Sequence, residues 1–246
     1  MGDFGAGEEP DSSSCPSCGG FGVLLSADGR RTVPCSCRRT ERSEARRIAA
    51  RIPERYRNCV LRNFSHLTDS QRAAGALARR FVEEWPAVGA GLLITGPVGT
   101  GKTHLAVAVL AELVETKGVH GLFCDFTDLL ERLQAGFNSR GGADEEGAAL
   151  VGACREAELL VLDELGARRP TDWVRDVLYG LLNTRYNQRR VTIVTTNFGD
   201  VAVGGGETLE TRLGLPVRSR LAEMCQTVAV DGPDFRRQVR PARAFA

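Results

Sequence analysis

The stretch Gly91-Leu-Leu-Ile-Thr-Gly-Pro-Val-Gly-Thr-Gly-Lys-Thr103 decides the fold of this 246-residue chain. Its first five residues form a short apolar run that ends in a glycine-rich turn, which is typical of a strand buried on both faces. Residues 96–103 then match the pattern G-x-x-x-x-G-K-[ST] at every fixed position, and a helical pattern follows. A strand, a glycine-rich loop and a helix in this order predict a phosphate-binding loop (P-loop) in an α/β domain.

The residue types of this loop suit a nucleotide. Glycines let backbone N–H groups curl around an anion, and the N-terminus of the following helix adds its positive dipole end. We expect Lys102 to reach the β- and γ-phosphates and the Thr103 hydroxyl to ligate Mg²⁺. A glycine-rich turn without a ligand is the alternative. The residues expected to contact ATP here are Gly96, Pro97, Val98, Gly99, Thr100, Gly101, Lys102, Thr103 and His104.

Two later apolar runs end in polar residues. Leu159-Leu-Val-Leu-Asp163-Glu164 closes with two carboxylates about 60 residues after the loop. We expect Asp163 to hold Mg²⁺ through water and Glu164 to take a proton from the attacking water, which favours hydrolysis over nucleotide sensing. Val191-Thr-Ile-Val-Thr-Thr-Asn197 is a further buried run. Asn197 is expected to bind the γ-phosphate or orient the lytic water, with an ordinary Asx turn as the alternative.

Apolar runs and helical patterns alternate along this part of the chain. Strands are expected at 91–95, 121–125, 158–162, 191–195 and 226–230, and helices at 103–115, 127–137, 172–188 and 217–224. Residues 138–147 are expected to form a loop, and the glycine-rich segment 201–209 is expected to be mobile. This alternation predicts an α/β fold with a five-stranded parallel sheet between helices.

Four of the eight cysteines fall within residues 15–37, as Cys15-Pro-Ser-Cys18 and Cys35-Ser-Cys37. A C-x-x-C pair followed by glycine forms a tight knuckle that directs two thiolates to one Zn²⁺, and the C-x-C pair is tighter than the usual spacing. We expect Cys15, Cys18, Cys35 and Cys37 to hold a structural Zn²⁺ that supplies much of the folding energy of this small segment. Redox-active or unmetallated cysteines are the alternative.

Composition divides the chain into four expected parts, which are a disordered tail (1–14), a Cys-rich zinc module (15–40), a basic linker helix (41–57) and an ATPase domain (58–246). The first residues lack the chemistry of a secretory signal, and no apolar run approaches the ~20 residues that cross a bilayer. We therefore expect a cytoplasmic protein with no membrane partner. The net charge is only +1, although arginines crowd residues 38–62. That basic run is a docking surface, a DNA contact or simply a solvated face.

These motifs, followed by Arg218-Ser-Arg220-Leu-Ala-Glu-Met, resemble the AAA+ ATPases, and more narrowly the DnaC/DnaI helicase loaders and the IstB-like transposition ATPases. The resemblance covers about Ile52 to Arg236. It implies the AAA+ P-loop NTPase fold after the zinc-knuckle module. In these families the segment corresponding to Ile52-Pro-Glu-Arg-Tyr56-Arg57 lies beside the nucleotide base, so Tyr56 is expected to contact ATP.

The resemblance also implies a site shared between subunits. In such families an arginine of one subunit neutralises charge on the γ-phosphate of its neighbour, and the matching residue is Arg220, with Arg218 as second candidate. An ordinary surface arginine is the alternative. Arg236, beside Arg237, resembles a sensor arginine that contacts nucleotide in cis. A head-to-tail contact of this kind is heterologous and implies nucleotide-dependent self-association or co-assembly on a hexameric partner.

Loaders of this type carry an extra helix after the second strand that lines a pore for single-stranded DNA. The matching segment is 128–140, in which Phe137 would stack on a base while Arg132 and Arg140 meet phosphates. The alternative is that Phe137 belongs to the core and that both arginines are solvated.

The resemblance therefore implies an ATP-dependent replication protein that loads the replicative hexameric helicase onto single-stranded DNA, with the N-terminal module gripping the helicase. An IstB-like helper that acts with a transposase on double-stranded DNA is the alternative. The cysteine module favours the loader, because IstB-type N-termini are typically short and helical. A third possibility is a regulatory module that uses ATP as an assembly signal with negligible turnover, and Glu164, Asn197 and Arg220 argue against it.

Overall fold

The computed structural model describes residues 15–26, 28–138, 145–168, 171–201 and 206–239. The chain forms two compact units that divide between Arg46 and Arg47. The expected N-terminal tail lies outside the described residues, and so do residues 202–205 of the glycine-rich segment that we expected to be mobile.

The first unit is built around a short hairpin. Strand β1 (Val23–Leu25) pairs antiparallel with β2 (Thr32–Pro34), and helix α1 (Ser36–Ala49) follows at once and runs past the boundary between the units. The helix ends at Ala49, eight residues before the end of the expected basic helix at Arg57. Arg51 has a left-handed backbone with φ of 55°, and Pro53 cannot donate a helical hydrogen bond, so the chain turns here.

The second unit contains the expected parallel sheet. The strand that precedes the P-loop lies inside the sheet, in the order β4-β5-β6-β3-β7, and all four neighbouring pairs are parallel. The strands are β3 (Gly91–Thr95), β4 (Gly121–Asp125), β5 (Leu159–Asp163), β6 (Val191–Thr196) and β7 (Cys225–Ala229). Each lies within one residue of its predicted position, because buried parallel strands are continuous apolar runs that end sharply at polar residues.

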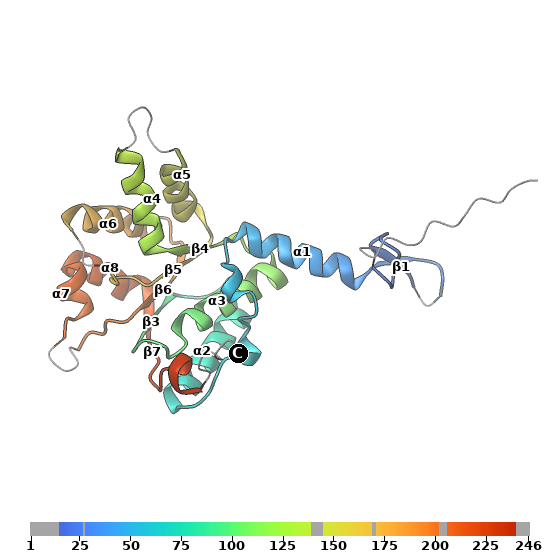
Figure 1. Ribbon diagram of the computed structural model, residues 1–246, viewed down its shortest axis with the longest axis horizontal. Helices are drawn as coiled ribbons and strands as arrows, with labels where there is room; N and C mark the ends of the chain where they lie inside the picture. Colours follow the sequence, from blue (N-terminus) through green and yellow to red (C-terminus); the bar gives the residue numbers. More distant parts are fainter. Residues whose placement is uncertain (1–14, 27, 139–144, 169–170, 202–205, 240–246) are drawn as a thin grey trace, which may run out of the picture. The chain divides into compact units, whose positions relative to one another are not determined.

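Helices cover the sheet on both faces (Figure 1). Alternate residues of β5 enter different cores: Leu159 and Val161 pack with α2 and α3, whereas Leu160 and Leu162 pack with α4, α5, α6 and α8. The helices are α2 (Asp69–Glu84), α3 (Lys102–Glu112), α4 (Phe126–Asn138), α5 (Glu145–Glu156), α6 (Asp172–Asn187), α7 (Leu209–Leu213) and α8 (Leu215–Met224). Shorter helical turns are η1 (Glu54–Tyr56), η2 (Leu61–Asn63), η3 (Leu113–Lys117) and η4 (Phe235–Val239).

Three of these helices, α2, α5 and α7, were not expected from the sequence. Helix α2 begins at a capping box in which the Thr68 hydroxyl accepts from the Gln71 backbone and the Gln71 side chain accepts from the Thr68 backbone. Helix α5 begins at Glu145, within the segment 138–147 that was predicted to be a loop. No helix in the described ranges is long and apolar enough to cross a membrane.

A fully buried arginine joins three of these elements. Arg185 on α6 has no exposed surface, and its guanidinium donates to the carbonyl oxygens of Cys154 (2.7 Å), Ala157 (2.8 Å) and Val191 and to the Thr192 hydroxyl (2.9 Å). Burial lowers the pKa of Arg185 to about 10. The cation therefore ties the C-terminal end of α5 to the start of β6 through carbonyl dipoles.

Replacing Arg185 by Met should destabilise the second unit. The carbonyls that it satisfies would be left buried without a donor, at a cost of about 3 kcal/mol in the free energy of unfolding. Urea unfolding followed by circular dichroism measures this. The matched variant Arg79→Met, at an exposed position of α2, should stay within about 0.5 kcal/mol of the parent. Equal stability of the two variants would contradict the buried role of Arg185.

Candidate functional site

A cavity of about 380 Å³ lies at the P-loop, with residues from the carboxyl ends of β5 and β6 in its wall. In parallel α/β sheets this is the edge at which ligands bind. Of the residues expected to contact nucleotide, Gly96 and Pro97 do not line the cavity in the described part of the chain. The lining residues are Tyr56, Cys59, Asn63, Phe64, Ser65, Gln71, Val98, Gly99, Thr100, Gly101, Lys102, Thr103, His104, Glu164, Thr195, Thr196, Asn197, Phe235 and Arg236.

The P-loop folds as its glycines allow. Gly99 and Gly101 have φ of 80° and 98°, and a Cβ at Gly101 would lie 2.9 Å from the Phe64 ring. Helix α3 starts at Lys102, whose Nζ donates to the Pro97 carbonyl oxygen at 2.7 Å. Burial lowers the pKa of Lys102 to about 8, although the charges of Asp163 and Glu164 oppose the shift. The lysine is thus held within its own loop, and a phosphate there would favour its charged form.

Behind the loop, Asp163 accepts two hydrogen bonds on one oxygen. Its Oδ1 accepts from the hydroxyls of Thr103 (2.9 Å) and Thr195 (2.5 Å), and the residue has no exposed surface. Burial raises the pKa of Asp163, while the two hydroxyls act in the opposite direction. Its Oδ2 is buried without a partner among the described residues. A hydroxyl and a carboxylate with one unused oxygen are oxygen ligands that suit Mg²⁺ and its water shell.

Glu164, the residue after Asp163, lies in a different environment because the backbone turns between them. Glu164 has φ of 57°, a conformation that is uncommon for residues other than glycine, and its N–H donates to the Thr195 hydroxyl at 3.1 Å. The turn leaves Asp163 buried and places Glu164 in the cavity wall. Asn197 follows β6 and lines the same cavity. A carboxylate, an amide and the P-loop lysine therefore face one space.

Another part of the cavity wall comes from residues before β3. Tyr56, the residue expected to contact ATP, is buried there, and burial raises its pKa. Phe64 packs against the imidazole of His104 with ring centroids 5.7 Å apart. The His104 Nε2 lies 3.0 Å from Asn63 Oδ1. Sequence reasoning missed Asn63 and Phe64, because nothing local indicates that they reach the P-loop.

Gln71 was also missed, and a sequence signal for it exists. It is the third residue after Thr68 in the T-x-x-Q capping box of α2. Its Oε1 accepts from the backbone at Thr68, and its Nε2 donates to the Thr100 carbonyl oxygen at 3.1 Å. The same side chain therefore caps a helix and holds the P-loop.

The segment after β7 closes the cavity. The Phe235 N–H donates to the Gly99 carbonyl oxygen at 3.0 Å, and Arg236 is exposed and lines the cavity. This is the wall on which a cis sensor arginine was expected. Arg237 is exposed and is not among the lining residues that the structure describes.

The two arginines considered for a trans role lie on α8 and do not line the cavity. Arg218 makes a bidentate ion pair with Asp200, with both N–O distances 2.6 Å. Arg220 donates to Asn183 Oδ1 at 3.0 Å and lies 4.1 Å from the centre of the Tyr186 ring. Their surroundings differ sharply, although only one residue separates them.

A third arginine, on α7, holds the loops that follow Glu164 and Asn197. The Arg212 guanidinium donates to the carbonyl oxygens of Gly166 and Ala167 (3.1 Å to the latter) and lies 4.5 Å from the centre of the Phe198 ring. The ends of β5 and β6 are therefore fastened to the α7–α8 pair as well as to each other.

The residues expected to bind DNA are only partly described. Arg132 on α4 forms an ion pair with Asp128, one helical turn away, at 2.9 Å. The side chain of Phe137 and all of Arg140 lie outside the described residues.

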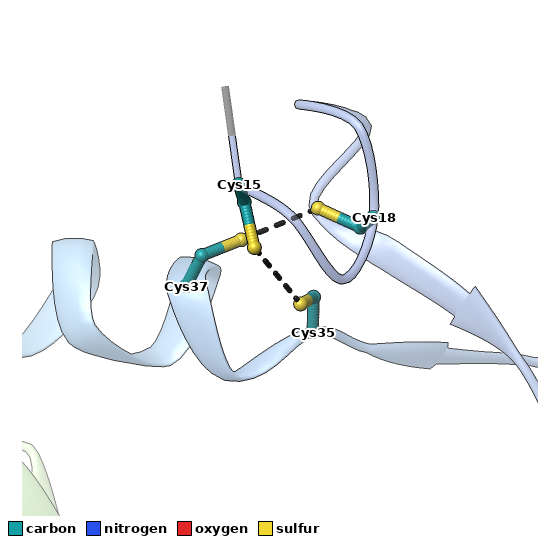
Figure 2. A group of neighbouring side chains, drawn as sticks. All are labelled: Cys15, Cys18, Cys35 and Cys37. Carbon is teal, nitrogen blue, oxygen red and sulfur yellow. Dashed lines mark hydrogen bonds between the residues drawn. The ribbon is translucent and has the colours of Figure 1, made fainter. Parts of the chain in front are cut away.

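In the first unit the four predicted cysteines converge (Figure 2). Their Sγ atoms all lie within 4.8 Å of one another, with Cys15 and Cys35 3.8 Å apart and Cys18 and Cys37 3.5 Å apart. Four sulfurs about 2.3 Å from a tetrahedral zinc ion are about 3.8 Å apart. The Gly22 N–H also donates to Cys18 Sγ at 3.2 Å. The cluster therefore fits a closed structural zinc site.

The comparisons with known proteins agree with one another. A family model described as IstB-like ATP binding protein matches residues 37–242. The replicative helicase loader DnaC of Escherichia coli strain K12 is 28% identical over 142 residues, 58% of this chain and 56% of that protein. The chain thus spans little more than half the length of this curated relative. An ATP-binding protein attributed to an insertion sequence of Sinorhizobium fredii is 34% identical over 119 residues, 48% of this chain and 38% of that protein.

Among solved structures, the crystal structure of the DnaC helicase loader superimposes with a TM-score of 0.62 at 33% identity, covering 72% of this chain and 99% of that one. The likeness extends over nearly the whole of the solved DnaC chain, and it agrees with the parallel sheet and P-loop described above.

Nucleotide binding should weaken as the pH rises through about 8, because the free protein loses the Lys102 proton there. Bound phosphates favour the charged lysine, so binding above this pH takes up a proton. We expect about tenfold weaker ATP affinity at pH 9 than at pH 7. Titration calorimetry in buffers of different ionisation enthalpy measures both the affinity and the proton uptake. Lys102→Arg, which keeps its charge, should bind more weakly but without this dependence. An unchanged affinity with no proton uptake would contradict the shifted pKa.

Proposed function

The chain belongs to the family of IstB-like ATP-binding proteins, and on that premise we propose that it hydrolyses ATP and loads the replicative DNA helicase onto single-stranded DNA. We choose the loader role because the chain resembles the DnaC helicase loader over 99% of the solved DnaC chain at 33% identity. The four-cysteine unit before the ATPase domain supports the same choice.

Within one chain, the cavity residues divide the work of hydrolysis. Lys102 and the P-loop amides hold the β- and γ-phosphates, while Thr103 would ligate Mg²⁺ directly and Asp163 would hold it through water. When bound, Mg²⁺ neutralises charge on the phosphate oxygens. Glu164 faces the cavity and accepts a proton from the attacking water, and Asn197 orients that water or binds the γ-phosphate.

A second copy of the chain completes the site. Arg220 does not line the cavity of its own chain, so its proposed role on the γ-phosphate is in trans. An arginine brought to the transferred phosphate group stabilises the transition state and is worth 10³–10⁵-fold in rate in well-studied cases. Hydrolysis then depends on a heterologous contact that builds rings or open helices. Arg236 is proposed to contact the nucleotide in cis.

The N-terminal unit is proposed to grip the helicase. Its four converging cysteines would hold Zn²⁺, and the metal would stabilise a segment too small to bury a sizeable core. The proposed contact to single-stranded DNA lies on α4, at Arg132, Phe137 and Arg140.

An IstB-like transposition helper acting on double-stranded DNA is the second candidate. The matching family model carries that description, and the Sinorhizobium fredii relative is attributed to an insertion sequence. The two candidates share the ATPase chemistry and differ in the partner, so a partner experiment separates them.

Freshly reduced protein should contain one zinc ion per chain. Cys35→Ser should lose it because three thiolates do not close a tetrahedral site, whereas Cys225→Ser, at a buried cysteine of the second unit, should keep it. Elemental analysis after desalting measures the content. Zinc-free parent protein with reduced thiols would refute the assignment.

A pull-down with the replicative helicase of the same cell tests the loader role. The full chain should retain the hexamer in the presence of ATP, and deletion of residues 1–40 or Cys35→Ser should abolish retention while ATP binding persists. The same pull-down is repeated with a transposase as the bait in place of the helicase. Retention of the transposase alone, with ATPase activity intact, would establish the second candidate instead.

A further inference from the structure

Arg218 and Arg220 lie on the same helix but differ in what surrounds their charge. Arg218 is neutralised by the two oxygens of Asp200. Arg220 forms no ion pair with any carboxylate that the structure describes, and its contacts are the neutral amide of Asn183 and the face of Tyr186. Of the two guanidinium groups, only that of Arg218 forms an ion pair within the part of the chain that the structure describes.

The two contacts come from adjacent turns of one helix. Asn183 and Tyr186 are three residues apart on α6, so their side chains project from the same face. One accepts a hydrogen bond at 3.0 Å, and the other offers a ring at 4.1 Å from the guanidinium carbon. An amide oxygen and an aromatic face attract a cation without cancelling its charge.

A third contact involves the Tyr186 hydroxyl. Glu223 stands one turn after Arg220 on α8, and its Oε1 accepts the Tyr186 hydroxyl proton at 2.6 Å. The bond fixes the Tyr186 ring against α8 and engages the Glu223 carboxylate. Arg220 is therefore held in one place by these contacts while remaining partly exposed.

We propose that Asn183 and Tyr186 are positioning residues that hold Arg220 at the surface, ready for the terminal phosphate of a nucleotide bound to a second copy of this chain. The inference rests on the proposed trans role of Arg220. It adds the cradle on α6 that keeps the arginine extended before the subunits meet, which lowers the entropy lost when the shared site forms.

Mixing inactive chains tests this directly. Arg220→Ala chains keep an intact cavity, Glu164→Gln chains keep the arginine, and each alone should hydrolyse ATP at no more than a few per cent of the parent rate. Mixed, they should recover activity at sites where a Glu164→Gln chain supplies its arginine to an Arg220→Ala chain. Asn183→Ala or Tyr186→Leu is then placed on either partner, with Tyr179→Leu, on the same helix, as the control.

The cradle should matter only on the chain that donates the arginine. On the Glu164→Gln chain we expect Asn183→Ala to lower the recovered rate at least threefold with an unchanged KM for ATP, and Tyr179→Leu to have no effect. On the Arg220→Ala chain, neither Asn183→Ala nor Tyr186→Leu should change the recovered rate. An equal loss on either chain, or no loss on the donor, overturns the positioning role and leaves the trans arginine intact. Absence of any recovery on mixing overturns the trans role itself and the inference with it.

Discussion

One oxygen of a buried carboxylate, Oδ1 of Asp163, accepts hydrogen bonds from hydroxyls on two other elements, α3 and β6. Burying a carboxylate without exposed surface is costly, and the two hydroxyls offset part of that cost while they join α3, β5 and β6. The Thr195 hydroxyl that donates to it also accepts the Glu164 N–H and so fixes the left-handed turn there. The positions of the P-loop helix, the buried Asp163 and the half-buried Glu164 all depend on this small network.

The strands and the ends of the strands were predictable because two constraints coincide. A strand buried on both faces must be an apolar run, and the polar residues that close such runs meet at one edge of a parallel sheet. Asp163 and Glu164 at the end of β5 and Asn197 after β6 follow from those constraints. The roles of Phe64 and Gln71 do not follow from those constraints, because they depend on contact with a loop about 30 residues or more away in the sequence. The end of α1 at Ala49 depends on the left-handed Arg51 together with Pro53, and the sequence reveals only the proline.

Arginine serves several purposes that look identical in the sequence. Arg185 is fully buried and braces α5 against β6 through carbonyl groups, Arg212 fastens the loops after β5 and β6, and Arg218 is locked in a bidentate pair. The planar fork of donors makes each of these arrangements possible. What distinguishes the arginines is the set of neighbours that the fold supplies, so the charge of a residue alone does not indicate its role.

Because Arg220 does not line the cavity of its own chain, the proposed contact between copies is directional. In the proposed assembly each copy would present the arginine at one end and the nucleotide at the other, so copies joined through this contact would form a polar series. An open series of n copies contains n − 1 complete sites, and one terminal cavity lacks its arginine; a closed ring completes all n. ATP turnover per chain would then report the geometry of the assembly, rising with the length of an open filament and reaching its maximum only on closure.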